Sequence, residues 1–440
     1  MEVFKFGGAS VKDAAGVRNL LRVLRELEAT EVVVVISAMG KMTNAFEELL
    51  RVYFEEKNPA GAEGGNPDLG AKTRERLRAI REFHLNIMEE LGFPDRHPVR
   101  EEIENLLDET RAFLRAAPSE DYDFVYDQVV SRGEMLSTRI CSAFLEREGM
   151  PNQWLDVREC ILTNSDFRRA RVDWEQTCEQ INRKVHRSRV TVTQGFLGRD
   201  GEGNTTTLGR EGSDYTAGIF AYCLDAVQVS IFKDVPGVLN ADPREFDRTE
   251  LLTMISYREA IEMAFFGASV IHPKTLQPLQ RKEIPLRVRS FVNPQEQGTY
   301  VRKGQHLEPD VPCFIVKKNQ ILLSVSDKEF HFVMEEDISE LFGQLGRYKM
   351  KVNMIQNSAI SFSVCIEDNF NNFNRLFEAL RPKYEVRFNK DLTLYTVRHF
   401  REEDLRMLEE GNTVLLKQLS RETAQLVVRQ RAERGAEGLN

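Results

Sequence analysis

Apolar and polar residues along the first part of the chain follow the order expected of strand, helix, strand and helix. The chain opens on a short apolar stretch that includes Val3 and Phe4, and Val32–Ile36 is an unbroken β-branched run. Between them, apolar residues recur with helical spacing at positions 17, 20, 21, 24 and 27. Continuous β-branched strands are typical of a parallel sheet that is buried on both faces. The pattern predicts a doubly wound α/β domain, which binds ligands at the carboxyl ends of its strands.

The hydrophobic pattern changes near residue 300. Apolar positions there alternate with polar ones, and the order of elements is strand, helix, strand and strand, followed by three further strands. This order predicts small α+β modules in which one face of the sheet is exposed to water. We therefore expect three segments, at 1–300, 301–385 and 386–440.

Composition narrows the class of protein. The 60 basic and 69 acidic residues give a net charge of −9, which argues against a general role in binding nucleic acid or anionic membranes. Six cysteines are scattered without a C-x-x-C pair, which is typical of buried or free thiols in a reducing cytoplasm. No apolar run approaches the ~20 residues needed to cross a bilayer, and no signal peptide is recognisable. These features predict a cytoplasmic globular protein.

The first candidate ligand site is the glycine turn after the first strand. Its sequence is Lys5-Phe6-Gly7-Gly8-Ala9-Ser10. Adjacent glycines let backbone N–H groups approach a ligand, and the lysine adds a positive charge where a phosphate would bind. An ordinary turn between strand and helix explains a K-x-G-G sequence equally well, and the spacing fits neither a Walker A loop nor a G-x-G-x-x-G fingerprint. Ser37 and Thr43 follow the second strand, so the topology predicts that they share an edge of the sheet with Lys5.

The second candidate is the segment 201–214, which is rich in glycine and threonine. It ends at Ser213 and Asp214, which we predict to be N-caps of a helix over Tyr215–Leu224. A helix N-terminus with Arg210 beside it is suited to binding anions. The alternative is a flexible loop before a capped helix, which the recurrence of arginine and glycine close to the cap makes less favourable.

Two further residues, Glu134 and Asp234, are ambiguous when each is considered alone, whereas His272 is not. Glu134, in the segment Ser131-Arg132-Gly133-Glu134 that opens a helix, could simply complement the helix dipole. Asp234, at a strand end, could bind a ribose or metal-bound water, or cap the turn. His272 precedes a proline in a tight turn, so we interpret it as structural rather than as a base.

Several stretches, taken together and in order, resemble the monofunctional aspartate kinases of the amino-acid kinase family. They are Lys5–Val11, Ser131–Glu134, Thr205–Asp214, Lys233–Val238 with Ala241–Arg244, and Phe266–Ala268 before His272-Pro273. The resemblance implies an amino-acid kinase-like α/β/α sandwich at 1–300, followed by two ferredoxin-like ACT modules that regulate the enzyme. It also implies ATP-dependent phosphorylation of the aspartate side chain to 4-phospho-L-aspartate, the first step toward lysine, threonine and methionine.

Roles for individual residues are likewise implied by this resemblance. Lys5 stabilises the transferring phosphoryl group and Asp214 belongs to the catalytic set, while Arg210 and Glu134 bind the α-carboxylate and the α-ammonium of aspartate. The rest of the substrate pocket comprises Ser37, Thr43 and Ser213. The residues assigned to ATP are Lys5, Gly7, Gly8, Ser10, Lys233, Asp234, Asp242, Arg244 and Lys274. Mg²⁺ is carried mainly by ATP oxygens, so no residue is assigned as a metal ligand.

The sequence also departs from this family. Ala9 stands where a hydroxyl residue is usual, and Ser269 where many relatives have a lysine, for which Lys274 is a candidate substitute. The segment Phe332–Asp337, in the effector loop of lysine-inhibited relatives, has no glycine and three consecutive acids, so we expect it to repel an effector carboxylate. The second module looks trimmed, with few residues for its first helix before Thr413 and no closing helix after Arg429. Feedback by lysine or threonine therefore stays open.

We expect a homodimer that pairs through the ACT-like modules. Two alternatives to an active aspartate kinase stay open at this point. One is another amino-acid kinase, with glutamate or a nucleotide as its substrate. The other is a regulatory homologue without turnover, which Ala9 and Ser269 suggest but the retained Lys5, Arg210 and Asp214 oppose.

Overall fold

The computed structural model describes residues 1–57, 69–117, 119–268, 271–304, 307–329, 332 and 334–430. The chain forms two compact units. The first comprises Met1–Val238, Leu251–Ile261 and Ile271–Pro309, and the second comprises Leu239–Glu250, Glu262–Val270 and Asp310–Asn440. Within the part of the chain that the structure describes, no helix has the length and apolar character needed to span a membrane.

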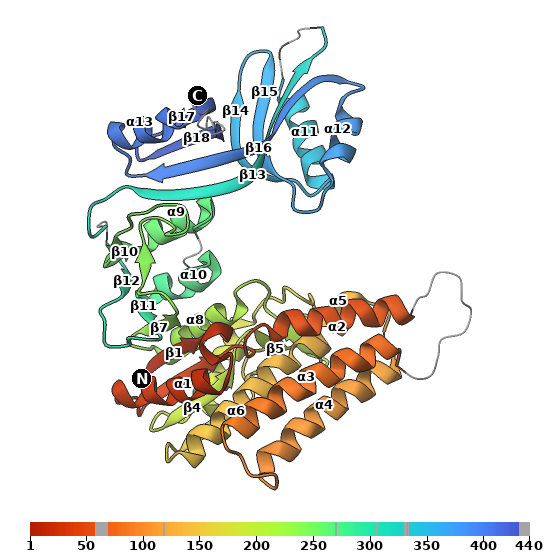
Figure 1. Ribbon diagram of the computed structural model, residues 1–440, viewed down its shortest axis with the longest axis vertical. Coiled ribbons are helices and arrows are strands. Elements are labelled where there is room, and N and C mark those ends of the chain that lie inside the picture. Colours follow the sequence, from red (N-terminus) through yellow and green to blue (C-terminus); the bar gives the residue numbers. More distant parts are fainter. Residues whose placement is uncertain are drawn as a thin grey trace, which may run out of the picture. The chain divides into compact units, whose positions relative to one another are not determined.

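A parallel-dominated sheet of eight strands organises the first unit (Figure 1). Its strand order is β10-β12-β11-β7-β1-β2-β4-β3. The strands of this sheet are β1 Glu2–Phe6, β2 Val32–Ile36, β3 Asn152–Leu155, β4 Val190–Gln194, β7 Val229–Lys233, β10 Met254–Ser256, β11 Leu286–Ser290 and β12 Thr299–Arg302. Short strands outside it are β5 Leu197–Arg199, β6 Thr205–Thr207, β8 Val238–Leu239 and β9 Leu251–Leu252. The α/β class predicted from the hydrophobic pattern is confirmed.

The helices that alternate with these strands along the chain are α1 Ala14–Glu26, α2 Met42–Lys57, α3 Ala71–Glu90, α4 Pro98–Ala116, α5 Tyr122–Val130, α6 Arg132–Arg147, α7 Trp174–Lys184, α8 Gly212–Leu224, α9 Tyr257–Phe266 and α10 Pro273–Lys282, with 3-10 turns at Gly8–Val11 and Val157–Glu159. Among them, α6 contacts β2, β3 and β4, and α8 contacts β1, β2 and β7. Phe4, Val34 and Ile36 pack in one core with apolar residues of α1 to α6. Val33 and Val35 alternate with these residues along β2 and are buried outside that core, toward the face where α8 packs against β1 and β2.

The register of the central strands determines where a ligand site can form. β1 pairs in parallel with β2 on one side and β7 on the other, so that Lys5 lies beside Val35 and Ile231. The carboxyl ends of the three strands therefore meet at one edge of the sheet. The segments that leave this edge are the glycine turn after β1, the turn after β2 that contains Ser37, and the turn after Lys233.

The second unit is built on a six-stranded sheet with the order β14-β15-β13-β16-β18-β17 (Figure 1). Its elements are β13 Cys313–Asp327, α11 Glu335–Arg347, β14 Lys351–Asn357, β15 Ser361–Glu367, α12 Phe373–Leu380, β16 Tyr384–Arg398, α13 Glu402–Glu410, β17 Asn412–Leu419 and β18 Thr423–Gln430. The long strands β13 and β16 pair antiparallel along most of their length. Residues on both sides of position 385 therefore belong to one sheet.

Two expectations for this unit need correction. The sheet face opposite α11 and α12 is partly buried rather than wet throughout, because Leu322 and Cys365 alternate with Leu323 and Val364 and belong to a second buried cluster. The second module also has its first helix, α13, in the nine residues Glu402–Glu410 before β17. A helix of this length fits between two strands because β16 extends only to Arg398. The closing segment from residue 431 lies outside the described residues.

The segment with three consecutive acids forms the start of α11. Glu335, Glu336 and Asp337 occupy its first turn, and the Asp337 carboxylate accepts a hydrogen bond from the Met334 N–H at 3.2 Å. Acidic residues there stabilise the helix dipole, which gives them a local structural role. The expected repulsion of an effector stays a prediction.

The cysteines differ from the sequence-based expectation of free thiols. Cys178 of α7 and Cys223 of α8 form a disulfide across 45 positions of sequence. The packing of α7 against α8 brings them together, and no spacing motif reveals such a pair. Cys141, Cys160 and Cys365 are free thiols and are buried, as expected, and Cys313 is buried as well.

Candidate active site

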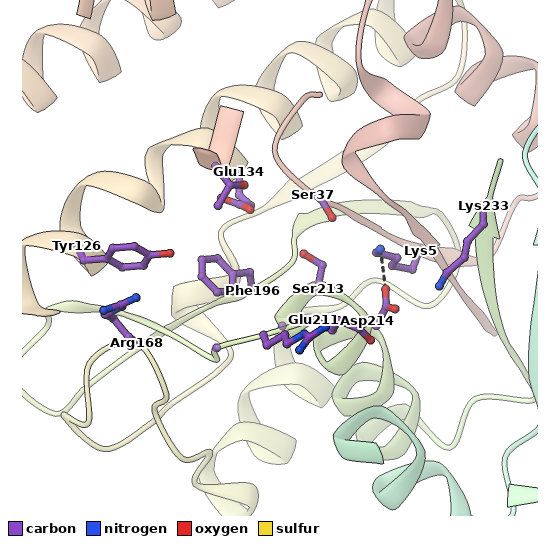
Figure 2. Close-up of a pocket in the computed structure, with 14 residues that line it drawn as sticks. Lys5, Ser37, Tyr126, Glu134, Arg168, Phe196, Glu211, Ser213, Asp214 and Lys233 are labelled. Carbon is purple, nitrogen blue, oxygen red and sulfur yellow. Dashed lines mark ion pairs between the residues drawn. The ribbon is translucent and has the colours of Figure 1, made fainter. Parts of the chain in front are cut away.

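A cavity of about 470 Å³ lies at the carboxyl edge of the first unit's sheet (Figure 2). The residues that line it are Lys5, Ser37, Thr43, Tyr126, Glu134, Arg168, Phe196, Gly209, Arg210, Glu211, Gly212, Ser213, Asp214 and Lys233. Eight of them were singled out from the sequence, namely Lys5, Ser37, Thr43, Glu134, Arg210, Ser213, Asp214 and Lys233. The structure therefore gathers into one cavity residues that are separated by up to 228 positions, from Lys5 to Lys233.

Lys5 is held at the cavity wall by an ion pair. It is the fourth residue of β1, only 9% of its surface is exposed, and its Nζ lies 2.6 Å from Oδ1 of Asp214. Asp214 is in the first turn of α8 and is also buried. A buried lysine and carboxylate in contact restrict each other's rotamers, so the ammonium group has a fixed position at the cavity. Figure 2 shows this pair beside Lys233.

Close backbone approach explains the glycine at position 8. A Cβ on Gly8 would lie 2.7 Å from the carbonyl oxygens of both Ala38 and Gly40. The Gly40 N–H donates to the Gly8 carbonyl at 2.9 Å, which joins the turn after β1 to the turn after β2. Without a side chain at Gly8 the two turns can pack directly, and this contact fixes Ser37 relative to Lys5.

Helix α8 begins earlier than the sequence suggested, which corrects the predicted caps. Its N-cap is Glu211, with a left-handed φ of 53°, and the helix runs from Gly212. Ser213 and Asp214 are therefore first-turn residues rather than N-caps. Gly212 allows this start because a Cβ there would lie 2.6 Å from the ring of Phe196. The positive end of the helix dipole consequently lies at the cavity wall, where it favours an anion.

Glu134 is a buried carboxylate with one unsatisfied oxygen. It is 3% exposed, and its Oε1 accepts a 3.3 Å hydrogen bond from the Ala38 N–H. Its Oε2 is buried and has no hydrogen-bond partner among the described residues. Burial raises the pKa of Glu134 to about 8. A carboxylate in this condition lacks a cationic partner, and a ligand ammonium group in the cavity could supply one.

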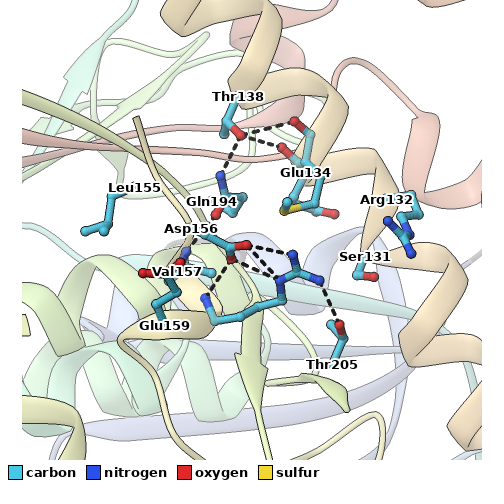
Figure 3. Close-up of polar contacts among 12 residues, drawn as sticks. Ser131, Arg132, Glu134, Thr138, Leu155, Asp156, Val157, Glu159, Gln194 and Thr205 are labelled. Carbon is cyan, nitrogen blue, oxygen red and sulfur yellow. Dashed lines mark hydrogen bonds and ion pairs between the residues drawn. The ribbon is translucent and has the colours of Figure 1, made fainter. Parts of the chain in front are cut away.

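Hydrogen bonds beneath Glu134 hold its helix on the sheet (Figure 3). The Thr138 hydroxyl donates to the Glu134 carbonyl at 2.9 Å and accepts from Nε2 of Gln194, at the end of β4, at 2.7 Å. The Gln194 side-chain oxygen accepts from the Val157 N–H at 2.8 Å. Since Gln194 and Thr138 are fully buried and satisfied, the first turn of α6 has a defined position, and so does Glu134.

Glu134→Gln is expected to stabilise the unliganded protein at alkaline pH. The pKa of Glu134 is raised in the folded state, so the side chain loses its proton at a lower pH in the unfolded chain than in the folded protein. The free energy of unfolding therefore falls as the pH rises from about 4.5 to about 8. The amide does not ionise, so the free energy of unfolding at pH 8 should rise by roughly 1–3 kcal/mol, and by less at pH 5.5.

Urea denaturation of both proteins at the two pH values measures this difference. Glu89→Gln, on the exposed surface of α3, is the matched control and should change stability by less than about 0.5 kcal/mol. A Glu134→Gln protein that is no more stable than the wild type at pH 8 would show that burial of the Glu134 carboxyl group does not lower the free energy of unfolding.

The remaining residues that were predicted for nucleotide binding do not line the cavity. Gly7, Gly8 and Ser10 lie in the turn directly after Lys5, with Ser10 buried, and Asp234 is exposed after β7. Lys274 of α10 directs its Nζ to the Leu208 carbonyl at 3.5 Å.

Two other residues that were predicted for nucleotide binding, Asp242 and Arg244, belong to the second unit and pair with each other at 2.6 Å. Position 269 lies outside the described residues.

His272 has the structural role expected of it. It is the N-cap of α10, and its Nδ1 accepts a hydrogen bond from the Lys274 N–H at 3.2 Å. This hydrogen bond gives the His272 side chain a role in capping the helix.

Sequence reasoning missed Tyr126, Arg168, Phe196 and Glu211. Of these, Arg168, Phe196 and Glu211 have φ values of 65°, 73° and 53°. Left-handed backbone at residues other than glycine is uncommon and is enriched at functional sites. At these three residues the left-handed backbone is set by tertiary contacts, so the sequence pattern does not predict it. Tyr126 of α5 lies one residue before a buried aspartate and has the spacing of an ordinary core residue.

Comparison with known proteins agrees with this fold and cavity. The family model for the amino acid kinase family matches residues 1–290. The lysine-sensitive aspartokinase 3 of Escherichia coli strain K12 is 35% identical over 369 residues, which cover 83% of this chain and 78% of the relative.

Solved structures of E. coli aspartokinase III match almost the whole chain. The complex with lysine and aspartate, in the T-state, matches with a TM-score of 0.81 and 30% identity, covering 97% of this chain and 96% of the other. The complex with aspartate and ADP, in the R-state, has a TM-score of 0.78 at 29% identity and the same coverage. The chain therefore belongs to the amino acid kinase family and, within it, to the aspartokinases.

Proposed function

We propose that the protein transfers the γ-phosphoryl group of ATP to the side-chain carboxylate of L-aspartate, forming 4-phospho-L-aspartate. This reaction is the entry step to lysine, threonine and methionine. The observation that carries the proposal is that Lys5, the N-terminus of α8 and Glu134 line the same cavity. Lys5 is fixed by Asp214, and the Glu134 carboxylate has one oxygen without a hydrogen-bond partner among the described residues. Such a cavity offers complementary charge to phosphate and to the ammonium of an amino acid.

The acceptor needs orientation more than activation. An aspartate side chain has a reference pKa of about 3.9 and is ionised at neutral pH, so no general base is required. Two anions must nevertheless approach each other. Lys5 neutralises charge on the transferring group, with Asp214 fixing its ammonium, and the positive end of α8 acts in the same direction.

Glu134 and Arg210 orient the amino acid. We assign the α-ammonium of aspartate to Glu134, whose Oε2 has no hydrogen-bond partner among the described residues, and the α-carboxylate to Arg210. The hydroxyl groups of Ser37, Thr43 and Ser213 complete the lining around the substrate. Binding the ammonium would replace the missing partner of Glu134, so aspartate affinity should rise as the pH increases toward the pKa of about 8.

Lys233 lines the same cavity and is assigned to the phosphates of ATP together with the backbone of Gly7, Gly8 and Ser10. We assign Asp234, Asp242, Arg244 and Lys274 to the nucleotide side. Among the described residues no group of three or more His, Cys, Asp or Glu side chains could hold a metal ion, and Asp214 is engaged by Lys5. We assign Mg²⁺ mainly to the phosphate oxygens of ATP, where it would neutralise part of their charge, and we assign no residue of the chain as its ligand.

For the molecule as a whole we propose a cytoplasmic homodimer. Its catalytic domain would comprise residues 1–300, and its ACT-like modules 301–385 and 386–440. β14 and β17 are the outer strands of the six-stranded sheet, so each offers backbone groups for pairing with a second copy.

ADP release measured with a coupled assay tests the proposed function. Purified protein with MgATP should release ADP on addition of L-aspartate, with a turnover of roughly 1–100 s⁻¹. L-Glutamate and a nucleoside monophosphate should give less than about one hundredth of that rate. Faster ADP release with L-glutamate or the nucleoside monophosphate than with L-aspartate would indicate another activity of the amino-acid kinase family. No release with any of the three would indicate a regulatory protein without turnover.

A further inference from the structure

The cavity contains a cation at the end opposite Lys5 that none of the roles above uses. Figure 2 shows Arg168 and Tyr126 on one side of the cavity and Lys5 and Lys233 on the other, with Glu134 and Phe196 between them. Arg168 belongs to the segment that precedes α7. If the side-chain carboxylate of an amino acid lies near Lys5 and its α-carboxylate points away from Lys5, the α-carboxylate would face this opposite end.

The backbone of Arg168 is fixed in an uncommon conformation. Its φ is 65°, and its N–H donates to both carboxylate oxygens of Asp127, at 3.0 and 3.1 Å. Asp127 is fully buried and also accepts hydrogen bonds from the N–H and the hydroxyl of Thr207, at 2.8 and 2.7 Å. Thr207 ends β6, three residues before Arg210. One buried carboxylate thus anchors both segments that bring an arginine to the cavity.

The guanidinium of Arg168 is also positioned, by an aromatic ring. It lies 4.5 Å from the ring centroid of Tyr126, whose hydroxyl donates to Glu47 at 2.7 Å. Its carboxylate partner is Asp123, at 3.0 Å, with about half of each side chain exposed. Exposed ion pairs of this kind contribute little to stability, so a ligand carboxylate can replace Asp123 without a large cost. The cation–π contact with Tyr126 keeps the guanidinium group close to this ring.

We propose that Arg168 is a specificity-determining residue that, with Arg210, binds the α-carboxylate of the acceptor. This inference rests on the proposed function, because it takes the acceptor to be an α-amino acid phosphorylated on its side chain. Two arginines on separately anchored segments would recognise a free α-carboxylate and reject acceptors in which that group is neutral. Asp127 is then a positioning residue, which acts through the backbone of Arg168.

The test compares binding of L-aspartate with binding of its α-amide, which lacks only the charge of the α-carboxylate. Isothermal titration gives the ratio of the two dissociation constants for the wild type, Arg168→Ala, Arg168→Lys and Arg171→Ala. Arg171 is the matched control, because its side chain is 80% exposed, pairs with Asp166 and does not line the cavity. Arg168→Ala should bind aspartate about tenfold more weakly and the α-amide nearly as well as the wild type, so that the ratio falls about tenfold. Arg168→Lys should recover part of the ratio.

An unchanged ratio in Arg168→Ala, or equal weakening of both ligands, would overturn the inference. Turnover of the wild type with aspartate, measured separately, distinguishes this failure from failure of the proposed function. A wild type that is active with aspartate and an Arg168→Ala variant with an unchanged ratio would remove Arg168 alone. A wild type that neither binds nor phosphorylates aspartate would overturn both.

Discussion

Lys5→Ala should lower kcat by about 10³-fold while changing the KM for aspartate by less than about threefold. Lys5 is the buried cation fixed at the cavity by Asp214, and it has no role in holding the amino acid. Its charge matters most when negative charge moves between ATP and the acceptor, because the stabilisation is then greater in the transition state than in the ground state. Steady-state kinetics with aspartate and MgATP varied separately measure this difference.

Lys12→Ala is the matched control for this substitution. Lys12 follows the same glycine turn, is exposed and does not line the cavity, so the variant should retain wild-type kcat. Loss of Asp214's partner could also disturb α8, and the circular dichroism spectrum and thermal midpoint of the Lys5 variant must match those of the wild type. A folded Lys5→Ala protein with unchanged kcat would remove Lys5 from phosphoryl transfer.

Arg210→Ala should raise the KM for aspartate by roughly 10- to 100-fold and leave the KM for ATP within about threefold. Arg210 is exposed at the cavity just before α8, so its removal leaves no buried charge and should not destabilise the fold. Because a contact with the α-carboxylate exists in both ground and transition states, kcat should change much less than KM.

Arg199→Ala, at the exposed end of β5, is a suitable control, since it removes the same charge from a residue that does not line the cavity. Initial rates at saturating ATP over a wide range of aspartate concentrations separate the two parameters. An aspartate KM equal to that of the wild type in the Arg210 variant would contradict the assignment of the α-carboxylate to Arg210.

The sequence was informative where a residue's position follows from strand order alone. Lys5 and Ser37 could be placed at one edge of the sheet because the carboxyl ends of neighbouring parallel strands lie at the same edge. The register of β1 with β2 and β7 has this arrangement. Glu134 was ambiguous by itself, and only the resemblance suggested a ligand contact. Its burial and its unsatisfied oxygen are properties of the folded cavity and have no counterpart in the sequence pattern.

The features that were missed depend on contacts between distant segments. Arg168 is brought to the cavity by Asp127, 41 positions earlier, through a backbone conformation that no local rule predicts. The start of α8 at Gly212 depends on contact with Phe196, and the disulfide of Cys178 depends on the packing of two helices. Propensity and periodicity describe single elements, whereas these features arise only from their packing.

Trapping the product with hydroxylamine tests the central claim most directly. An acyl phosphate reacts with hydroxylamine to form a hydroxamate, and mass spectrometry against synthetic standards distinguishes the side-chain hydroxamate of aspartate from the α-hydroxamate. The purified protein with MgATP and L-aspartate should give the side-chain hydroxamate in an amount equal to the ADP released. The α-hydroxamate, or ADP release without any hydroxamate, would contradict phosphorylation of the aspartate side chain.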